Sequence, residues 1–278
     1  MKAGHSLDLA AGAEAASPAA PPVGQNEHIW LWRLASIGLL FLLWEIAGRI
    51  PINPAFPAFG ETFIALVGMI RDGSIFTAYA STLQPLLLGL VVSAAAGVSL
   101  GVAMGLSRWA EWVFAPVFIV LQAAPMAALV PLLTFIYGIG LTSKTLAVIM
   151  LALPVIALNG YKAVANASPS LIAMCRSFQG TRRQQILKII IPDASPVIFA
   201  GLRLGVAAGF IGVVLAELLI TPTGIGDLIT YHRSVANYAE MYASVVSIIL
   251  LAALTLAGLE LFETRVLRPE KGGAHAGA

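Results

Sequence analysis

Residues 196–220 read PVIFAGLRLGVAAGFIGVVLAELLI, a run of 25 residues with only two charged side chains, Arg203 and Glu217. A helix needs roughly 20 mostly apolar residues to cross the hydrocarbon core of a bilayer, so this run predicts a transmembrane helix. The rest of the chain has the same character, since 59% of its residues are hydrophobic and 11% are charged. Soluble domains are about 25% charged. We therefore expect an all-α integral membrane protein.

Six segments of the chain, of which the fourth is short, predict about six transmembrane helices. Their expected bounds are residues 29–48, 78–106, 112–137, 145–159, 196–220 and 242–262. A short helix is expected at residues 60–70, after a proline-rich connection at residues 51–57. A polar stretch at about residues 162–195, between the fourth and fifth spans, is long enough for two further helices outside the membrane.

Basic residues set the expected orientation, because cytoplasmic loops of membrane proteins carry an excess of Lys and Arg. With the N-terminus inside, only four of the 16 Lys and Arg residues face outward, and these are Arg49, Arg71, Lys144 and Arg233. Both termini are therefore expected in the cytoplasm. Residues 1–28, rich in Ala, Gly and Pro, predict a disordered cytoplasmic tail. The transmembrane domain is expected at residues 29–266 and a second cytoplasmic tail at residues 267–278.

Glycines recur at every fourth position in two of the expected spans. Such a row gives a helix one smooth face against which a second backbone packs closely. We expect these faces to pack within the bundle, and they could also slide during a functional cycle. The two rows are Gly97, Gly101 and Gly105, and Gly201, Gly205 and Gly209.

Prolines interrupt the third expected span at positions 116, 125 and 131. Irregular backbone at membrane depth is tolerated where protein buries it or water lines it, so this span is a candidate for lining a solute path. The alternative is a set of kinks that only shape the bundle. Glu217 is either paired with a cation or faces a wet cavity, because an isolated carboxylate in the membrane is costly. The candidate path residues are Gln122, Pro125, Pro131, Thr134 and Glu217.

The polar loop carries its own helix signals. Ser168 and Pro169 predict a helix start, and an apolar stripe follows at Leu171, Met174, Cys175 and Phe178. We expect Gly180 to end this helix in the left-handed conformation.

A second loop helix is expected to follow directly. Thr181 to Gln184 form a capping box that starts it, Pro192 is expected to stop it, and Ser195 with Pro196 to cap the fifth span. The first loop helix either inserts into a groove on a partner or lies flat on the lipid surface.

Several stretches of the sequence resemble a known family. The loop ends in Ile189-Ile190-Ile191-Pro192, and residues 125–132 read PMAALVPL before Gly138-Ile139-Gly140. Residues 201–205 read GLRLG, residues 216–219 read AELL, and residues 224–226 read GIG. Over roughly residues 78–265, the chain is similar to the permease subunits of binding-protein-dependent ABC importers, in their nitrate, sulfonate and taurine branch.

The family marks the loop with Glu-Ala-Ala and a glycine four residues later. Here those positions hold Ala173-Met174-Cys175 and Gln179, so the acidic residue is missing. The resemblance implies that the loop couples the permease to an ATPase. The residues that it assigns to coupling are Arg176, Ser177, Phe178, Gln179, Gly180, Thr181, Arg182, Arg183 and Pro192.

The resemblance also implies the partners. These are a second permease copy, expected as a homodimer, two ATP-binding subunits that hold ATP and Mg, and a periplasmic or lipoprotein solute-binding protein. The location implied is the bacterial inner membrane, and the solute is a small oxyanion such as nitrate, taurine or an alkanesulfonate. No cofactor or metal is expected on this chain, and no nucleic acid partner.

Enzymatic activity is not expected. Residues 138–145 superficially resemble a phosphate-binding loop, but Ser143 stands where the phosphate cradle needs glycine. ATP hydrolysis would therefore belong to a partner chain. A secondary transporter or channel that works without an ATPase is the main alternative, and an intramembrane enzyme is a weaker one, because no nucleophile with its base and no pair of metal ligands lies within a span.

Overall fold

The computed structural model describes residues 29–50, 55–220 and 222–267, and every regular element in these ranges is a helix. The expected tail at residues 1–28 lies outside the described residues, as does the second tail apart from Leu267. The helices are α1 (Ile29–Arg49), α2 (Phe59–Arg71), α3 (Ser74–Leu106), α4 (Arg108–Ala123), α5 (Met126–Tyr137), α6 (Leu141–Ala165), α7 (Pro169–Ser177), α8 (Arg182–Gln185), a π-helical turn η1 (Ile186–Ile190), α9 (Ile191–Ile220), α10 (Ile225–Ser234) and α11 (Tyr238–Leu267).

The chain is a multi-pass membrane protein. Within the described residues, four helices are long and apolar enough to cross a membrane, and α4 with α5 makes a fifth if this bent pair counts as one span. The four are Ser74–Leu106, Leu141–Ala165, Arg182–Ile220 and Tyr238–Arg265. The first expected span coincides with α1, but its role as a sixth span stays a prediction. The short helix expected at residues 60–70 is α2.

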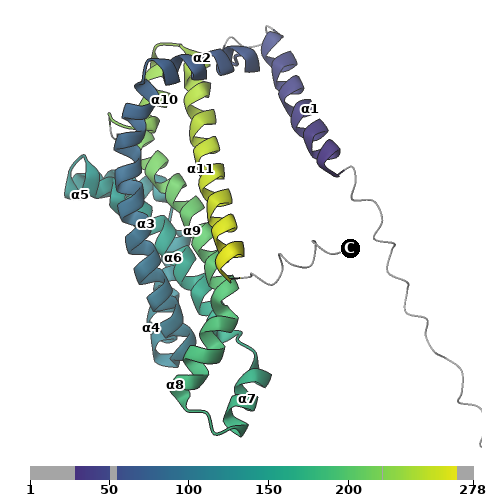
Figure 1. Ribbon diagram of the computed structural model, residues 1–278. Coiled ribbons are helices and arrows are strands. Elements are labelled where there is room, and N and C mark those ends of the chain that lie inside the picture. The colour runs from purple at the N-terminus through teal and green to yellow at the C-terminus, as the bar shows by residue number, and fades with distance from the viewer. Residues whose placement is uncertain (1–28, 51–54, 221, 268–278) are drawn as a thin grey trace, which may run out of the picture.

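The third expected segment is not one continuous helix. It breaks between α4 and α5, which are bent by 102° relative to one another, and α5 projects from the side of the bundle (Figure 1). The cause is Pro125, since the residue before a proline is disfavoured in the helical region. Ala124 accordingly has an extended backbone, with φ −68° and ψ 136°. The irregular backbone expected from the prolines is therefore present.

Helix α6 lies at the centre of the bundle, between α3 and α9. Its residues Ala147, Val148, Ala152 and Ala157 are fully buried. Both glycine rows pack against this helix or its neighbours. A Cβ atom placed on Gly101 would lie 2.7 Å from the carbonyl oxygen of Ala157. Close backbone approach therefore holds the three helices together, as expected where lipid supplies no hydrophobic force between them.

We expect Gly101→Ala to destabilise the protein by about 1–3 kcal/mol, the usual effect of overpacking a tight core. The added methyl group would collide with the backbone of α6, which has no side chain there that can rotate away. Gly68→Ala in α2 is the matched control, because a Cβ at Gly68 meets nothing within 4 Å and alanine favours a helix over glycine. Thermal unfolding in detergent measures both variants, and equal unfolding temperatures would contradict the close packing of α3 on α6.

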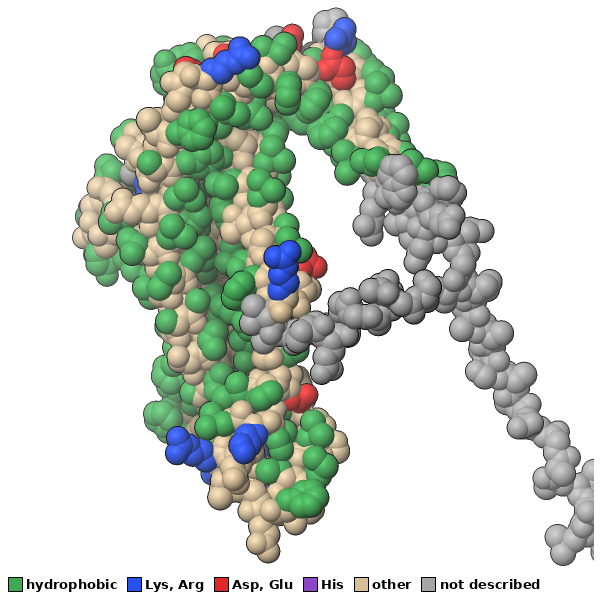
Figure 2. Space-filling model, in the orientation of Figure 1, with side chains coloured by type: hydrophobic (Ala, Val, Ile, Leu, Met, Phe, Trp, Pro, Cys, Tyr) green, Lys and Arg blue, Asp and Glu red, His purple; other side chains and the backbone are tan. Residues whose placement is uncertain are grey.

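Different short helices lie at the two ends of the bundle. Helices α2 and α10 lie at one end and α7 with α8 at the other, while α1 stands apart from the bundle beyond α2 (Figure 1). In Figure 2, hydrophobic side chains cover the length of the bundle, whereas most visible Lys and Arg side chains lie at its two ends and near the C-terminal end of α11. This distribution fits a lipid-facing surface between two polar ends.

Candidate functional site

The loop that carries α7 and α8 is held to the bundle at its start. The N-cap of α7 is Ser168, followed by Pro169, as expected. The Ser168 hydroxyl shares a hydrogen bond of 2.9 Å with Ser170 rather than capping the backbone. The Ser168 N–H instead donates to a carboxylate oxygen of Asp193 at 2.9 Å, which ties the loop to the first turn of α9.

Helix α7 ends differently from the expectation. The left-handed residue is Gln179, with φ +56°, and not Gly180. The Gly180 N–H then donates to the carbonyl of Cys175 at 2.8 Å, which closes a Schellman-type turn. Gly180 serves another need, because a Cβ there would collide with the Cys175 side chain and lie 2.9 Å from its carbonyl oxygen. The left-handed position is the one at which the importer family has glycine.

We expect Gln179→Gly to stabilise the loop by about 1 kcal/mol, since glycine adopts the left-handed conformation without the penalty that a Cβ causes. Opening of the loop should then be about fivefold rarer, which tryptic cleavage after Arg182 and Arg183 in the folded protein can measure. The control Gln185→Gly should speed cleavage, because it places glycine within a helix and removes the hydrogen bond of 3.1 Å from the Gln185 amide to the Gly180 carbonyl. Faster cleavage of Gln179→Gly would contradict the left-handed assignment.

The second loop helix begins as expected and ends differently. The Thr181 N–H donates to the Gln184 side chain at 2.8 Å and the Gln184 N–H donates to the Thr181 hydroxyl at 3.3 Å, which is the capping box. Pro192 does not stop this helix, and Ser195 with Pro196 does not start another. Residues 182–220 form one apolar helix. The wider π-helical turn η1 precedes Pro192 and moves the carbonyls that its ring would strike in an α-helix.

Most of the apolar stripe of α7 is exposed in the described part of the chain, while Cys175 is partly buried. Met174 is 53% exposed and Phe178 is 80% exposed, and α7 has no buried residue. Next to Phe178, the side chains of Arg176, Ser177, Gln179, Arg182 and Arg183 are exposed as well. An exposed aromatic ring flanked by cationic side chains, on a short capped helix, has the geometry of a docking element.

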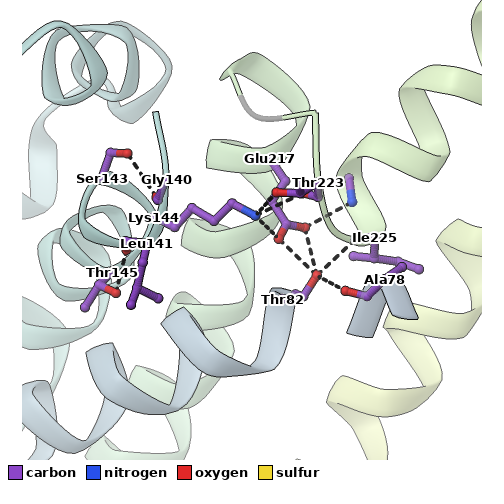
Figure 3. A network of polar contacts seen from close by, with 11 residues as sticks. Ala78, Thr82, Gly140, Leu141, Ser143, Lys144, Thr145, Glu217, Thr223 and Ile225 are labelled. Carbon is purple, nitrogen blue, oxygen red and sulfur yellow. Dashed lines mark hydrogen bonds and ion pairs between the residues drawn. The ribbon is translucent and has the colours of Figure 1, made fainter. Parts of the chain in front are cut away.

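A second polar centre lies at the opposite end of the bundle, in the interior. Lys144 of α6 donates to a carboxylate oxygen of Glu217 of α9 at 2.9 Å, and the two side chains are 4% and 0% exposed. The Thr82 hydroxyl of α3 lies 3.0 Å from both oxygens of that carboxylate. Lys144 also donates to the carbonyl of Thr223 at 2.9 Å. Figure 3 shows these side chains converging from three helices on the connection between α9 and α10.

Two glycines make room for this buried pair. Gly224 has φ +101°, and a Cβ there would collide with the Glu217 carboxylate. A Cβ at Gly226 would lie 2.5 Å from Cβ of Glu217, and the Gly226 N–H donates to Glu217 at 3.1 Å. The Ile225 N–H donates to the Thr82 hydroxyl at 2.9 Å. The Gly-Ile-Gly stretch therefore folds over Glu217 and fixes the start of α10.

Four of the candidate path residues lie on the broken pair α4 and α5 and the connection between them, and the fifth, Glu217, lies on α9. Gln122, Pro125 and Pro131 have exposed side chains, and the partly buried Thr134 donates to its own helix, at the carbonyl of Val130. Glu217 is buried in the closed ion pair instead of facing a wet cavity. The pairing alternative is thus confirmed, and the partner is Lys144, which was expected to face outward. Because the Lys144 ammonium group pairs with Glu217, it does not act as the lysine of a phosphate-binding loop.

Arg203 forms a third polar contact, between α9 and α11. Its guanidinium lies 3.7 Å from a carboxylate oxygen of Glu260 and 3.3 Å from one of Glu263. The positive charge of Arg203 is therefore already shared by two carboxylates of the same chain. This arrangement favours a packing role for Arg203 over attraction of a solute.

Comparison with protein families identifies residues 93–268 as a match to the model for the binding-protein-dependent transport system inner membrane component. The putative aliphatic sulfonates transport permease protein of Bacillus subtilis is 24% identical over 88% of this chain and 90% of its own length. The taurine transport system permease protein of Escherichia coli is 27% identical over 85% and 92%, respectively. The nitrate import permease protein of Leptolyngbya laminosa is 25% identical over 73% of each chain.

Solved structures show the same fold. An inward-facing structure of the MetNI methionine ABC transporter matches with a TM-score of 0.56 and 17% identity, over 71% of this chain and 98% of that chain. An amino acid ABC transporter matches with a TM-score of 0.56 and 19% identity, over 72% and 98%.

Proposed function

The chain belongs to the family of binding-protein-dependent transport system inner membrane components and is the membrane-spanning subunit of an ATP-driven importer; from this premise we propose that its solute is a small oxyanion. The relatives named for aliphatic sulfonates, taurine and nitrate support this class of solute. Each of these solutes carries a compact, delocalised negative charge. Selection among them would lie mostly with the solute-binding protein.

The family works with an ATPase and a separate solute-binding protein. For this chain we infer a homodimer with two ATP-binding subunits that hold ATP and Mg on the cytoplasmic side, and a periplasmic or lipoprotein receptor on the other. The orientation that places α7, α8 and both termini on the cytoplasmic side of the bacterial inner membrane is supported by the predominance of Lys and Arg on that side. The Lys144–Glu217 pair then lies at the end that faces the receptor.

We infer the role in coupling to the ATPase from the exposed apolar stripe of α7. We propose that Phe178 inserts into a groove on the ATPase and that Arg183 reaches acidic groups around it, since arginine suits ion pairs at interfaces, while Arg176 and Arg182 belong to the coupling loop that presents the ring. Ser177, Gln179, Gly180 and Thr181 would shape the turn that presents the ring. Pro192 lies inside the helix that runs from the loop into the membrane. It would help this helix to transmit movement of the ATPase to the membrane spans.

The solute path is proposed to lie between two copies of the chain. Gln122, Pro125, Pro131 and Thr134 belong to the broken pair α4 and α5, whose exposed side chains would face the second copy or the path. Glu217 takes no direct part in this proposal, because its carboxylate is enclosed in the ion pair. Its part would be to hold α3, α6 and α9 in register while they move.

We expect Arg203→Gln to keep the uptake of an oxyanion within about twofold of the wild type. The reason is that Glu260 and Glu263 already neutralise Arg203, which leaves little charge to attract a solute. Uptake in proteoliposomes at several solute concentrations checks this expectation. A rise in the apparent KM of tenfold or more, in a variant that folds normally, would instead assign Arg203 to the solute path.

Reconstituted transport tests the proposed function directly. The chain, the ATP-binding subunit and the receptor encoded beside it are placed in liposomes, and uptake of labelled taurine, an alkanesulfonate and nitrate is measured with ATP inside or outside. We expect uptake of at least one of these anions only when ATP is available to the ATPase. Uptake that is independent of ATP would favour a secondary transporter, and the absence of uptake for all three anions would contradict the oxyanion proposal.

A further inference from the structure

A cavity of about 550 Å³ lies between the loop and the end of α3. Arg176 of α7 and Arg182 of α8 line it, so two cationic side chains from different helices border one space. The hydrogen bond from Gln185 to the Gly180 carbonyl holds the turn between these helices. The cavity is therefore part of the folded loop and separate from the exposed Phe178 ring on which the docking proposal rests.

Within the part of the chain that the structure describes, the two arginines have no anionic partner. Among the described residues, the ion pairs involve Arg49, Lys144 and Arg203, and neither Arg176 nor Arg182 takes part in one. The sequence explains this, since residues 163–192 contain four Lys and Arg residues and no Asp or Glu. Asp193 follows directly, but its carboxylate accepts the Ser168 N–H. Two neighbouring cations without a counter-charge favour the binding of an external anion.

The remaining wall of the cavity is mostly apolar, although the polar side chain of Gln185 also borders it. Leu106, Ile172, Ile186 and Ile190 contribute to it, and Leu106 is the last residue of the 33-residue apolar helix α3. The cavity thus lies at the level where a membrane span ends. A free inorganic anion would use only the polar half of this lining. A lipid would place its headgroup between the arginines and the start of its acyl chains along the four apolar side chains.

We propose that this cavity binds the phosphate group of an anionic phospholipid. The inference rests on the proposed function only in placing the loop at the cytoplasmic membrane surface. The bound headgroup bridges α7 and α8 through Arg176 and Arg182, and so it steadies the loop that presents Phe178. The lipid composition of the cytoplasmic leaflet thereby regulates how well the loop is ordered for its partner.

Binding to the purified full-length chain, without ATPase or receptor, tests the proposal. The probes are a short-chain phosphatidylglycerol, the phosphatidylcholine with the same acyl chains, and inorganic phosphate, each titrated into the protein in a neutral detergent. We expect phosphatidylglycerol to bind at least tenfold more tightly than the other two probes. Because each arginine near a membrane surface contributes about a fivefold gain, the double variant Arg176→Gln/Arg182→Gln should lose about 30-fold.

The matched control is Arg183→Gln/Lys188→Gln, which removes the same charge from exposed side chains of the same loop that do not line the cavity. We expect it to change the affinity less than threefold. Equal losses in both double variants would overturn the site in favour of diffuse charge attraction, as would equal binding of the two phospholipids. Inorganic phosphate that binds as tightly as phosphatidylglycerol would overturn the lipid assignment. None of these results depends on transport, so a failed uptake assay leaves them intact.

Discussion

Glu217→Leu should lower the apparent unfolding temperature of the protein in detergent by about 10 °C or more. Removing one member of a buried ion pair costs about 3–5 kcal/mol, because the remaining charge is left without its partner in a medium that solvates it poorly. Here the remaining charge is the ammonium group of Lys144, whose side chain is 4% exposed. Thr82 and the Gly226 N–H lose their acceptor at the same time. The monodisperse fraction that survives heating measures this effect.

The double variant Lys144→Met/Glu217→Leu is the control that distinguishes the effect of an unpaired buried charge from the effect of altered side-chain packing. It replaces the pair with apolar side chains of similar volume, an exchange that is often neutral or stabilising for buried pairs. We therefore expect the double variant to unfold at a higher temperature than Glu217→Leu alone. A double variant that is no more stable than Glu217→Leu alone would contradict the ion-pair account. It would point instead to a role for the Lys144 contact with Thr223.

Phe178→Asp should weaken the binding of the purified ATP-binding subunit by about 30-fold or more. An aromatic ring buried at the centre of an interface is commonly worth 2 kcal/mol or more, and the introduced carboxylate adds a desolvation penalty. Because the ring is 80% exposed in the isolated chain, the substitution should leave the fold of the chain unchanged. Titration of the subunit against the detergent-solubilised chain measures the loss.

Phe178→Leu keeps an apolar side chain at the same place and is expected to lose less than tenfold. Similar losses for the aspartate and leucine variants would mean that the aromatic shape matters more than the apolar character. No loss in either variant would exclude Phe178 from the interface.

The sequence predicts the bundle well where local signals dominate. The apolar runs give α3, α6, α9 and α11, and the two glycine rows indicate the faces on which helices pack. The capping box at Thr181 is a short-range pattern, and it forms as expected. Each of these features depends on residues within one or two helical turns, which is the range that periodicity and capping rules describe.

Other features depend on contacts that no local rule contains. Helix α6 begins at Leu141, earlier than expected, and Lys144 lies buried in its first turn instead of in an outer loop. Its partner Glu217 is 73 positions away along the chain. A lysine near the start of one apolar run and a glutamate near the end of another is the signal that could have suggested this pair.

The corrections in the loop have similar causes. Gly180 is the residue that local preference selects for the left-handed position, but the left-handed residue is Gln179, and Gly180 lies where a Cβ would collide with Cys175. Pro192 ordinarily ends a helix, but the preceding π-helical turn accommodates its ring. In both cases the neighbouring backbone, rather than the residue itself, decides the outcome.

We propose that this importer subunit engages its ATPase through the exposed stripe of α7. The most direct test is to express the tagged chain together with the ATP-binding subunit encoded beside it and to measure the amount of ATPase that co-purifies, for the wild type and for Phe178→Asp. We predict that the ATPase co-purifies with the wild type in equal molar amount and is lost from the variant. Failure of the wild-type chain to retain the ATPase, or equal retention by both proteins, would contradict the claim.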